Sequence, residues 1–234
     1  MSSKKDSIYR NGRYLQAHPG WHGEDSAWKA EQVARMLERN GLEPSQICEV
    51  GCGAGRVLVS LMDRLPASVR FFGYEISPDA YTLTQDIGED RIEFFLADLL
   101  DEPVTYELVC CLDVVEHVED YLGFLRRLRP RGQLKLFHLP LEITVERLLR
   151  RDGFLSVRRR FGHLHHFTRQ SALASLEDTG YRVIDWLYTP SELVLPPKSL
   201  GQRLARIPRR LVYLLHKGLA ARTTGGVSLM VLAE

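Results

Sequence analysis

Three glycines at alternate positions follow a short apolar segment of this 234-residue chain. The segment is 47–50, and the glycines are Gly51, Gly53 and Gly55. Glycine has no Cβ, so a glycine-rich turn after a strand lets the backbone approach a ligand closely. A dinucleotide-binding fingerprint needs a further glycine at position 56, where this chain has Arg56. The spacing therefore disfavours a nicotinamide-dependent oxidoreductase.

Carboxylates follow the next apolar segments. Glu75 and Asp98 each end a β-rich segment, and Asp113 follows the segment 106–112. Ligands of open α/β sheets bind beyond the carboxyl ends of the strands, so these side chains are expected at one edge of the sheet. A carboxylate after the second strand can accept hydrogen bonds from both hydroxyls of a ribose. Ordinary helix capping is the alternative role of Glu75 and Asp98.

Histidines near the later segments are candidates for proton transfer. Glu116 and His117 follow the fourth strand, and His138 ends the fifth. A general base is needed only where an acceptor arrives protonated, and Asp113 is a further candidate for that role. A helix position turned to solvent is the alternative for His117.

A second group of histidines lies at 163–166. Its spacing alone would allow a metal site, but no carboxylate or cysteine lies nearby in the sequence. We therefore expect no metal. His163 and His166 are interpreted as substrate-binding residues of a loop, with an ordinary structural role as the alternative.

Strands that alternate with helices must position these residues. Such alternation predicts an α/β fold, doubly wound, with a mostly parallel sheet and helices on both faces. Ser26 is expected to cap the first helix, and Pro78 to begin a later one. The expected strands are 47–50, 69–74, 92–96, 106–112, 134–137, 181–188 and 227–232, and the expected helices are 26–40, 57–65, 118–128 and 168–179, with one more starting at 77–79.

Taken in order, these motifs resemble class I S-adenosylmethionine-dependent methyltransferases of the small-molecule type. The resemblance covers about residues 21–188 and the last strand, and it implies seven strands with the last one antiparallel. It also implies S-adenosylmethionine as the cofactor, released as S-adenosylhomocysteine. The implied cofactor-binding residues are Glu49, Gly51, Cys52, Gly53, Gly55, Glu75, Ile76, Asp98, Leu99, Asp113 and Val114. The implied catalytic candidates are His117 and Glu116, with His138, His163 and His166 as candidates for binding the substrate.

The resemblance divides the chain into three parts. Residues 1–45 form an N-terminal lid and helix region, in which Trp21 and His22 suggest packing over a pocket. Residues 46–188 and 227–234 form the Rossmann-like core, and 189–226 form a basic amphipathic insert before the last strand.

The insert has leucines at helical spacing and several arginines. We favour packing of the leucines on the domain with the arginines in water. A lid over the acceptor and membrane-surface contact through 200–217 are the alternatives. Pro208 is expected to begin a new helix, because proline inside a helix removes a hydrogen bond.

Charge is balanced over the whole chain and unbalanced within it. Lys plus Arg number 31 and Asp plus Glu 30, which excludes a surface built throughout for a polyanion. Residues 193–234 nevertheless hold seven basic residues and one acidic residue. Together with the arginines of 147–160, this suits an anionic small acceptor, and no nucleic-acid partner is expected.

The four cysteines lack metal-knuckle spacing and are predicted to be buried, reduced thiols. No apolar run is long enough to span a bilayer, and the first residues do not resemble a leader, so a cytoplasmic location is expected. The oligomeric state stays open.

The sequence therefore predicts a methyltransferase that moves a methyl group from S-adenosylmethionine to a small acceptor by in-line displacement. Oxygen, nitrogen and carbon acceptors are all open. A non-catalytic cofactor- or partner-binding module on the same fold is the alternative.

Overall fold

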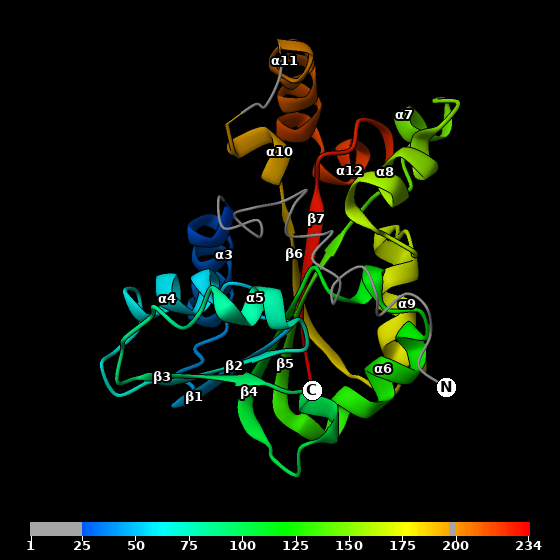
Figure 1. Ribbon diagram of the computed structural model, residues 1–234. Coiled ribbons are helices and arrows are strands. Elements are labelled where there is room, and N and C mark those ends of the chain that lie inside the picture. Colours follow the sequence, from blue (N-terminus) through cyan, green and yellow to red (C-terminus); the bar gives the residue numbers. More distant parts are fainter. Residues whose placement is uncertain (1–24, 197–199) are drawn as a thin grey trace. The chain divides into compact units, whose positions relative to one another are not determined.

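The structure, a computed structural model, describes residues 25–196 and 200–234. Its strands are β1 (Gln46–Val50), β2 (Arg70–Glu75), β3 (Ile92–Leu96), β4 (Tyr106–Leu112), β5 (Gly132–Pro140), β6 (Val183–Thr189) and β7 (Ser228–Ala233). They form one sheet in the order β3-β2-β1-β4-β5-β7-β6 (Figure 1). β1 pairs in parallel with β2 and β4, whereas β7 runs antiparallel to β5 and β6. The mostly parallel, seven-stranded α/β sheet with an antiparallel last strand is confirmed.

The chain divides into two compact units. The first consists of the residues up to Cys111 together with Pro130–Leu134. The second consists of Leu112–Arg129 and Lys135–Glu234. The glycine loop and the carboxylates up to Asp98 belong to the first unit, and the expected site residues from Asp113 onward belong to the second.

In the first unit, helices accompany strands β1 to β3 (Figure 1). They are α3 (Ser26–Arg39), α4 (Arg56–Met62), α5 (Pro78–Thr82) and the 3-10 helix η2 (Leu99–Asp101). The helical spacing of Trp28, Val33, Met36 and Leu37 buries all four side chains, and α3 packs on α4. Burying a side chain of this size contributes about 1.5–3 kcal/mol, so the apolar stripe is sufficient to fix α3.

Two expected helix starts have different outcomes. The expectation that Ser26 caps α3 is wrong, because Ser26 is the first helical residue and Asp25 precedes it as the N-cap. The Asp25 side chain makes no cap hydrogen bond and pairs instead with Lys29 at 3.3 Å. The start at Pro78 is confirmed, since the Ser77 hydroxyl accepts a hydrogen bond from the Ala80 amide.

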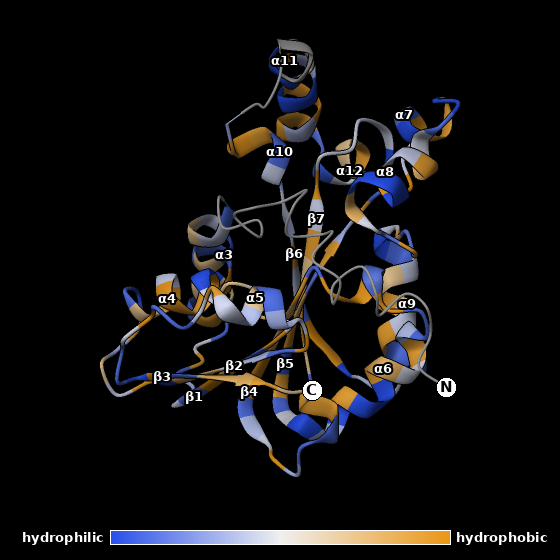
Figure 2. Cartoon of the chain, in the orientation of Figure 1, coloured by the Kyte–Doolittle hydropathy of each residue, from blue (hydrophilic) through white to orange (hydrophobic). Residues whose placement is uncertain are grey.

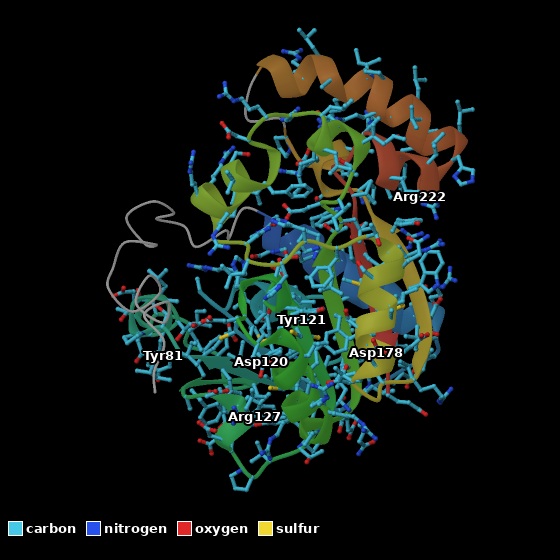
Figure 3. All side chains as sticks on the ribbon, turned by 90° about the vertical axis from the view of Figure 1, so that its right-hand side faces the viewer. Tyr81, Asp120, Tyr121, Arg127, Asp178 and Arg222 are labelled. Carbon is cyan, nitrogen blue, oxygen red and sulfur yellow. The ribbon has the colours of Figure 1, made fainter. Side chains whose placement is uncertain are left out.

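The second unit holds the remaining helices. They are η3 (Val115–His117), α6 (Tyr121–Leu128), α7 (Val145–Leu148), α8 (Gly153–Phe161), α9 (Arg169–Asp178), α10 (Ser191–Val194), α11 (Leu200–Leu215) and α12 (Lys217–Thr223), and η4 (Arg129–Arg131) lies where the units meet in sequence. The hydroxyl of Tyr121 on α6, labelled in Figure 3, forms a hydrogen bond of 3.2 Å with the hydroxyl of Ser175 on α9. The sequence pattern predicts no helix between 138 and 166, whereas α7 and α8 occupy much of that segment. Figure 2 shows hydrophobic and hydrophilic residues mixed on α8, because three consecutive arginines at 158–160 lie among the apolar positions Phe154, Val157 and Phe161.

The segment between β6 and β7 corrects two expectations. Pro208 lies inside α11 and does not begin a helix. An interior proline costs about 3 kcal/mol, and the residues on either side of Pro208 are anchored to α10. Arg206 donates hydrogen bonds to the carbonyls of Leu193 and Val194 at 2.7 Å, and Arg209 pairs with Glu192 at 2.9 Å.

These polar anchors also decide which face of α11 is exposed. The expectation that its leucines pack on the domain is wrong: the apolar side chains that are 58–87% exposed are Leu204, Ile207, Leu211, Leu214 and Leu215. The side chain of Arg209 is only 14% exposed, because it also pairs with Glu146. The lid and the membrane-surface interpretations stay predictions. Within the described ranges, no helix is long and apolar enough to cross a membrane.

All four cysteines are buried thiols, as predicted; they are Cys48, Cys52, Cys110 and Cys111. Burial raises the pKa of Cys48, Cys52 and Cys110 well above the usual value. These thiols are therefore apolar packing groups rather than nucleophiles.

Candidate functional site

The glycine loop of the first unit is tied to the end of β2. Gly51 and Cys52 donate backbone hydrogen bonds to the Tyr74 carbonyl at 2.8 and 3.1 Å. Gly53 donates to the Glu75 Oε2 atom at 2.9 Å, and the other oxygen of Glu75 accepts from the Ser77 amide at 2.8 Å. Each carboxylate oxygen has two lone pairs, so acceptor capacity remains for ligand hydroxyls.

The loop also requires glycine on steric grounds. Gly51, Gly53 and Gly55 have φ values of 70°, 56° and 71°, in the left-handed region that side chains disfavour. A Cβ at Gly55 would come within 2.6 Å of the Phe94 ring. The alternate glycines therefore give a left-handed turn packed on an aromatic ring at the start of α4.

The remaining expected cofactor residues of the first unit differ in exposure. Glu49 and Glu75 are almost fully buried, and burial raises the pKa of Glu75 despite hydrogen bonds from the amides of Ser77 and Gly53. Cys52 is buried, whereas Ile76 is 41% exposed. The loop thus combines a buried carboxylate held by backbone amides with an exposed apolar side chain next to it.

Asp98 performs the capping role that the sequence left open. Its Oδ1 atom accepts a hydrogen bond from the Leu100 amide at 2.9 Å, so Asp98 is the N-cap of η2. Leu99 is fully buried beside it. Capping uses one oxygen of the carboxylate and is compatible with a ligand on the other.

In the second unit, Asp113 and His138 form a close pair. Asp113 Oδ1 lies 2.6 Å from His138 Nδ1, and His138 Nε2 lies 2.8 Å from the Thr189 hydroxyl. An ionised carboxylate only accepts hydrogen bonds, so His138 Nδ1 carries the proton. His138 is 2% exposed, and both of its ring nitrogens face protein partners.

Asp113 has an unusual backbone. Its φ is 56°, and it is the one non-glycine residue with positive φ among those the structure describes. Its amide donates to the His138 carbonyl at 3.0 Å, so both its backbone and its side chain are tied to β5. Val114 follows as the N-cap of η3. Strain of this kind persists where surrounding bonds determine the conformation, and it concentrates at functional sites.

Three further expected residues come together at η3. Glu116, His117 and His163 bring one ligand-type atom each within 4.8 Å of the others. The rings of His117 and His163 are nearly perpendicular, with centroids 4.8 Å apart. Glu116 is fully buried, and its carbonyl accepts hydrogen bonds from the Leu164 and His165 amides at 2.7 and 3.2 Å. The structure therefore joins the Glu116–His117 pair to the 163–166 histidines.

Glu142 is a site residue that the sequence pattern does not indicate. Its Oε2 atom lies 3.0 Å from His163 Nδ1 and 2.7 Å from His166 Nδ1. Burial raises the pKa of Glu142, but the hydrogen bonds from His163 and His166 outweigh burial, and charge on His163 and Arg147 adds to them, so the pKa is lowered to about 2. No carboxylate lies near these histidines in the sequence, but Glu142 lies beside them in the structure.

Glu142 belongs to none of the sequence motifs described above. It follows β5 within an otherwise apolar stretch, 21 residues before His163. A single acid after a strand is the only local signal. Trp21 and His22, the expected lid residues, lie outside the described part of the chain, and so does the rest of 1–24.

The sheet order and the glycine loop after β1 define the class of protein: an α/β fold of the class I methyltransferase type. Residues 21–185, more than half of the chain, match the methyltransferase domain family. The chain belongs to this family of S-adenosylmethionine-dependent class I methyltransferases, as the sequence resemblance implies.

Similarity to individual proteins is partial. A mitochondrial ubiquinone biosynthesis O-methyltransferase of Schizosaccharomyces pombe is 32% identical over 111 residues, which span 42% of this chain and 39% of the relative. Norajmaline N-methyltransferase of Rauvolfia serpentina is 25% identical over 108 residues, 43% of this chain and 36% of the relative. The chain therefore spans less than half the length of these two relatives.

Several solved structures align with nearly the whole chain. One of them is magnesium protoporphyrin IX methyltransferase from Synechocystis PCC 6803, crystallised with S-adenosylhomocysteine. The TM-score is 0.62 at 15% identity, over 98% of this chain and 96% of the other. At this identity the likeness shows a shared fold.

Proposed function

We propose that this protein transfers a methyl group from S-adenosylmethionine to a small-molecule acceptor. The observation that carries the proposal is the hydrogen bond between Glu75 and the Gly53 amide, which holds a buried carboxylate beside a left-handed glycine loop. Membership of the methyltransferase domain family supports it. So do the names of the two partial relatives, which are an O-methyltransferase and an N-methyltransferase of small molecules.

The roles of the cofactor-binding residues form part of the proposal. The remaining lone pairs of Glu75 accept hydrogen bonds from the ribose hydroxyls, and Asp98 accepts one from the adenine amino group. Glu49 lies near the methionine amine. The other proposed cofactor-binding residues are Gly51, Cys52, Gly53, Gly55, Ile76, Leu99, Asp113 and Val114.

The chemical step asks little of the protein beyond alignment. The sulfonium group is already a good leaving group, so binding and orientation supply most of the acceleration. We propose His117, with Glu116 beside it, for removal of a proton from an acceptor that arrives protonated. His163 and His166 belong to the same cluster and are proposed to bind the acceptor.

The charge of the acceptor is a finer part of the proposal. Some arginines of 147–160 have acidic partners: Arg147 lies 4.0 Å from Glu142, and Arg150 pairs with Glu146. Three more arginines, at 158–160, follow one another on α8, and Arg151 lies between α7 and α8. We propose that an anionic acceptor contacts the arginines of α8.

Calorimetric titration of the full chain with S-adenosylhomocysteine tests the cofactor assignment. We expect one-site binding that weakens on Glu75→Ala. Absence of binding, or unchanged affinity of this variant, would overturn the assignment. Release of labelled methyl groups over a panel of hydroxyl, amine and carboxylate acceptors then separates an enzyme from a non-catalytic binding module.

The base is tested separately. His117→Ala is expected to reduce methyl transfer while leaving affinity for S-adenosylhomocysteine almost unchanged. Equal loss of both would argue against a role in proton transfer.

A further inference from the structure

The second unit contains one group of side chains whose types match a metal site. Within the described residues, the candidate group is Glu116, His117 and His163. Two imidazoles and one carboxylate are the ligand set of catalytic zinc sites and of other divalent transition-metal sites that keep open positions. The three residues come from η3 and from the loop between α8 and α9, which are distant in the sequence.

Backbone hydrogen bonds hold the two segments together. The Glu116 carbonyl accepts from the Leu164 and His165 amides, directly after His163. The side chain of His165 adds a bond to the Glu119 carbonyl at 3.1 Å, and its ring packs on Tyr121. Because these contacts hold the two segments together, the side chains of Glu116, His117 and His163 lie close to one another.

The carboxylate of Glu142, outside the three-residue group, fixes the tautomer of His163. Glu142 Oε2 accepts from His163 Nδ1 at 3.0 Å, so the lone pair of the neutral ring lies on Nε2. Glu142 is itself held by His166 at 2.7 Å. Metal-binding histidines typically donate their other nitrogen to a carboxylate in this way, which sets the tautomer and the ring orientation.

We propose that Glu116, His117 and His163 bind a divalent transition-metal ion, with zinc as the reference ion, and that Glu142 orients His163 for this purpose. Nothing in methyl transfer itself requires such an ion, so the proposal goes beyond it. With the ion bound, His117 and Glu116 are ligands rather than the base, and coordination to the ion replaces them as the means of lowering the pKa of an acceptor hydroxyl. Ligand atoms around one tetrahedral zinc lie about 3.3 Å apart, given zinc–nitrogen bonds of about 2.0–2.1 Å. Separations of up to 4.8 Å close to this value mainly by rotation of His117, which is only partly buried, while the hydrogen bond to Glu142 keeps the orientation of the His163 ring.

Three protein ligands leave a position for an oxygen atom of water or of a bound molecule. A bound divalent ion lowers the pKa of a hydroxyl that coordinates to it. If the proposed methyl transfer is also correct, the site would select acceptors whose oxygen atoms bind the metal. Metal binding is measured by calorimetry and cobalt spectroscopy, which do not depend on methyl transfer.

The test uses tag-free, full-length protein stripped of metal with a chelator. Zinc is titrated calorimetrically, and cobalt is added as a spectroscopic probe whose visible d–d bands report bound nitrogen and oxygen ligands. We expect one ion per chain. Glu116→Gln and His163→Ala should each abolish the cobalt bands or weaken zinc affinity at least 100-fold, and Glu142→Gln should weaken it about 10- to 100-fold.

His165→Gln is the matched control, because His165 lies in the same loop and outside the ligand group, and a glutamine amide can still donate to the Glu119 carbonyl. It should keep the affinity and the spectrum. Because Glu116 is fully buried, its replacement can destabilise the fold, so thermal unfolding of each variant is recorded. His117→Gln changes a partly exposed ligand of the same group and should weaken zinc affinity in a folded protein.

Three results would overturn the proposal: no zinc binding by the intact protein, binding that survives both Glu116→Gln and His163→Ala, or equal loss in His165→Gln. S-adenosylhomocysteine binding is measured on the same samples. Zinc binding without S-adenosylhomocysteine binding would reject the methyltransferase proposal alone, and the reverse would reject the metal site alone.

Discussion

The Glu75 carboxylate accepts a hydrogen bond from the Gly53 amide at 2.9 Å and so connects the end of β2 to the loop after β1. The Ser77 amide holds the second oxygen at 2.8 Å. The carboxylate is therefore oriented before any ligand arrives, and its rotational freedom is not lost on binding. The same contact makes Glu75 both a structural and a ligand-binding residue.

Glu75→Gln should weaken S-adenosylhomocysteine binding about 10- to 100-fold, equivalent to about 1.4–2.8 kcal/mol, since hydrogen bonds to a charged group are lost. Calorimetric titration measures the change. Glu93→Gln, on the exposed side of β3 and paired with Arg70 at 3.4 Å, is the matched control and should leave the affinity unchanged. Equal effects of the two substitutions would reject the role of Glu75.

Acid pH should weaken cofactor binding through the same residue. Burial raises the pKa of Glu75 above the usual 4.5, so Glu75 protonates at a higher pH than an exposed glutamate and then loses acceptor capacity. Because protonation removes acceptors, the affinity measured against pH should fall earlier on acidification in the wild type than in Glu75→Gln, and parallel profiles would contradict this.

The stability of the fold changes with pH in the opposite direction. Because the folded pKa of Glu75 is raised, its contribution to stability is present at low pH and is lost as pH rises through the folded pKa.

Gly55→Ala should be more destabilising than the same change at another left-handed glycine. The new Cβ would incur left-handed strain of about 1–2 kcal/mol and would also meet the Phe94 ring. Gly41→Ala is the control, since Gly41 has φ of 61° and nothing within 4 Å of the new atom. Urea unfolding measures both, and Phe94→Leu should restore part of the loss at Gly55 only. Equal costs at the two positions would show that Phe94 does not constrain the loop.

Asp113 and His138 should be energetically coupled. Their hydrogen bond of 2.6 Å predicts a coupling free energy of about 1–3 kcal/mol in a double-mutant cycle of Asp113→Asn and His138→Leu. Urea unfolding of the four proteins measures it. Asp120→Asn, which changes the α6 N-cap labelled in Figure 3, should be additive with His138→Leu to within about 0.5 kcal/mol. Additivity of the Asp113 pair would show that the contact contributes nothing to stability.

Lys135 should make stability depend on alkaline pH. Burial on β5 and the charge of Arg129 lower its pKa from 10.5 to about 8, although Glu234 opposes this. Between those values the unfolded chain binds more protons, so stability rises with pH in that window. Lys135→Met removes the cost of burying the charge and should stabilise the protein at about pH 7 by about 1–2 kcal/mol.

The difference between Lys135→Met and the wild type should shrink toward about pH 9.5, as measured by urea unfolding at several pH values. A constant difference would contradict the lowered pKa. The ring of Tyr181 lies 5.5 Å from the Lys135 ammonium, so the methionine gives up one cation–π contact that opposes part of the gain.

Local patterns in the sequence determined the strands, the glycine loop and the residues at the strand ends. The expected strands 92–96 and 106–112 coincide with β3 and β4, because short apolar runs between turn signals indicate strands, both for the buried β4 and for the partly exposed edge strand β3. Gly51, Gly53 and Gly55 were identifiable because a left-handed turn demands glycine. Glu75 was identifiable because it ends its strand.

Only the tertiary structure decided how the later residues combine. Glu142 meets His163 and His166 across more than twenty residues, and Glu116 meets the same loop through its carbonyl. No local periodicity encodes such contacts, because they arise from how separate elements pack within the second unit. The same reason places the leucines of α11 in solvent: the ion pairs of Arg209 with Glu146 and Glu192 orient the helix, and its amphipathic pattern alone does not reveal them.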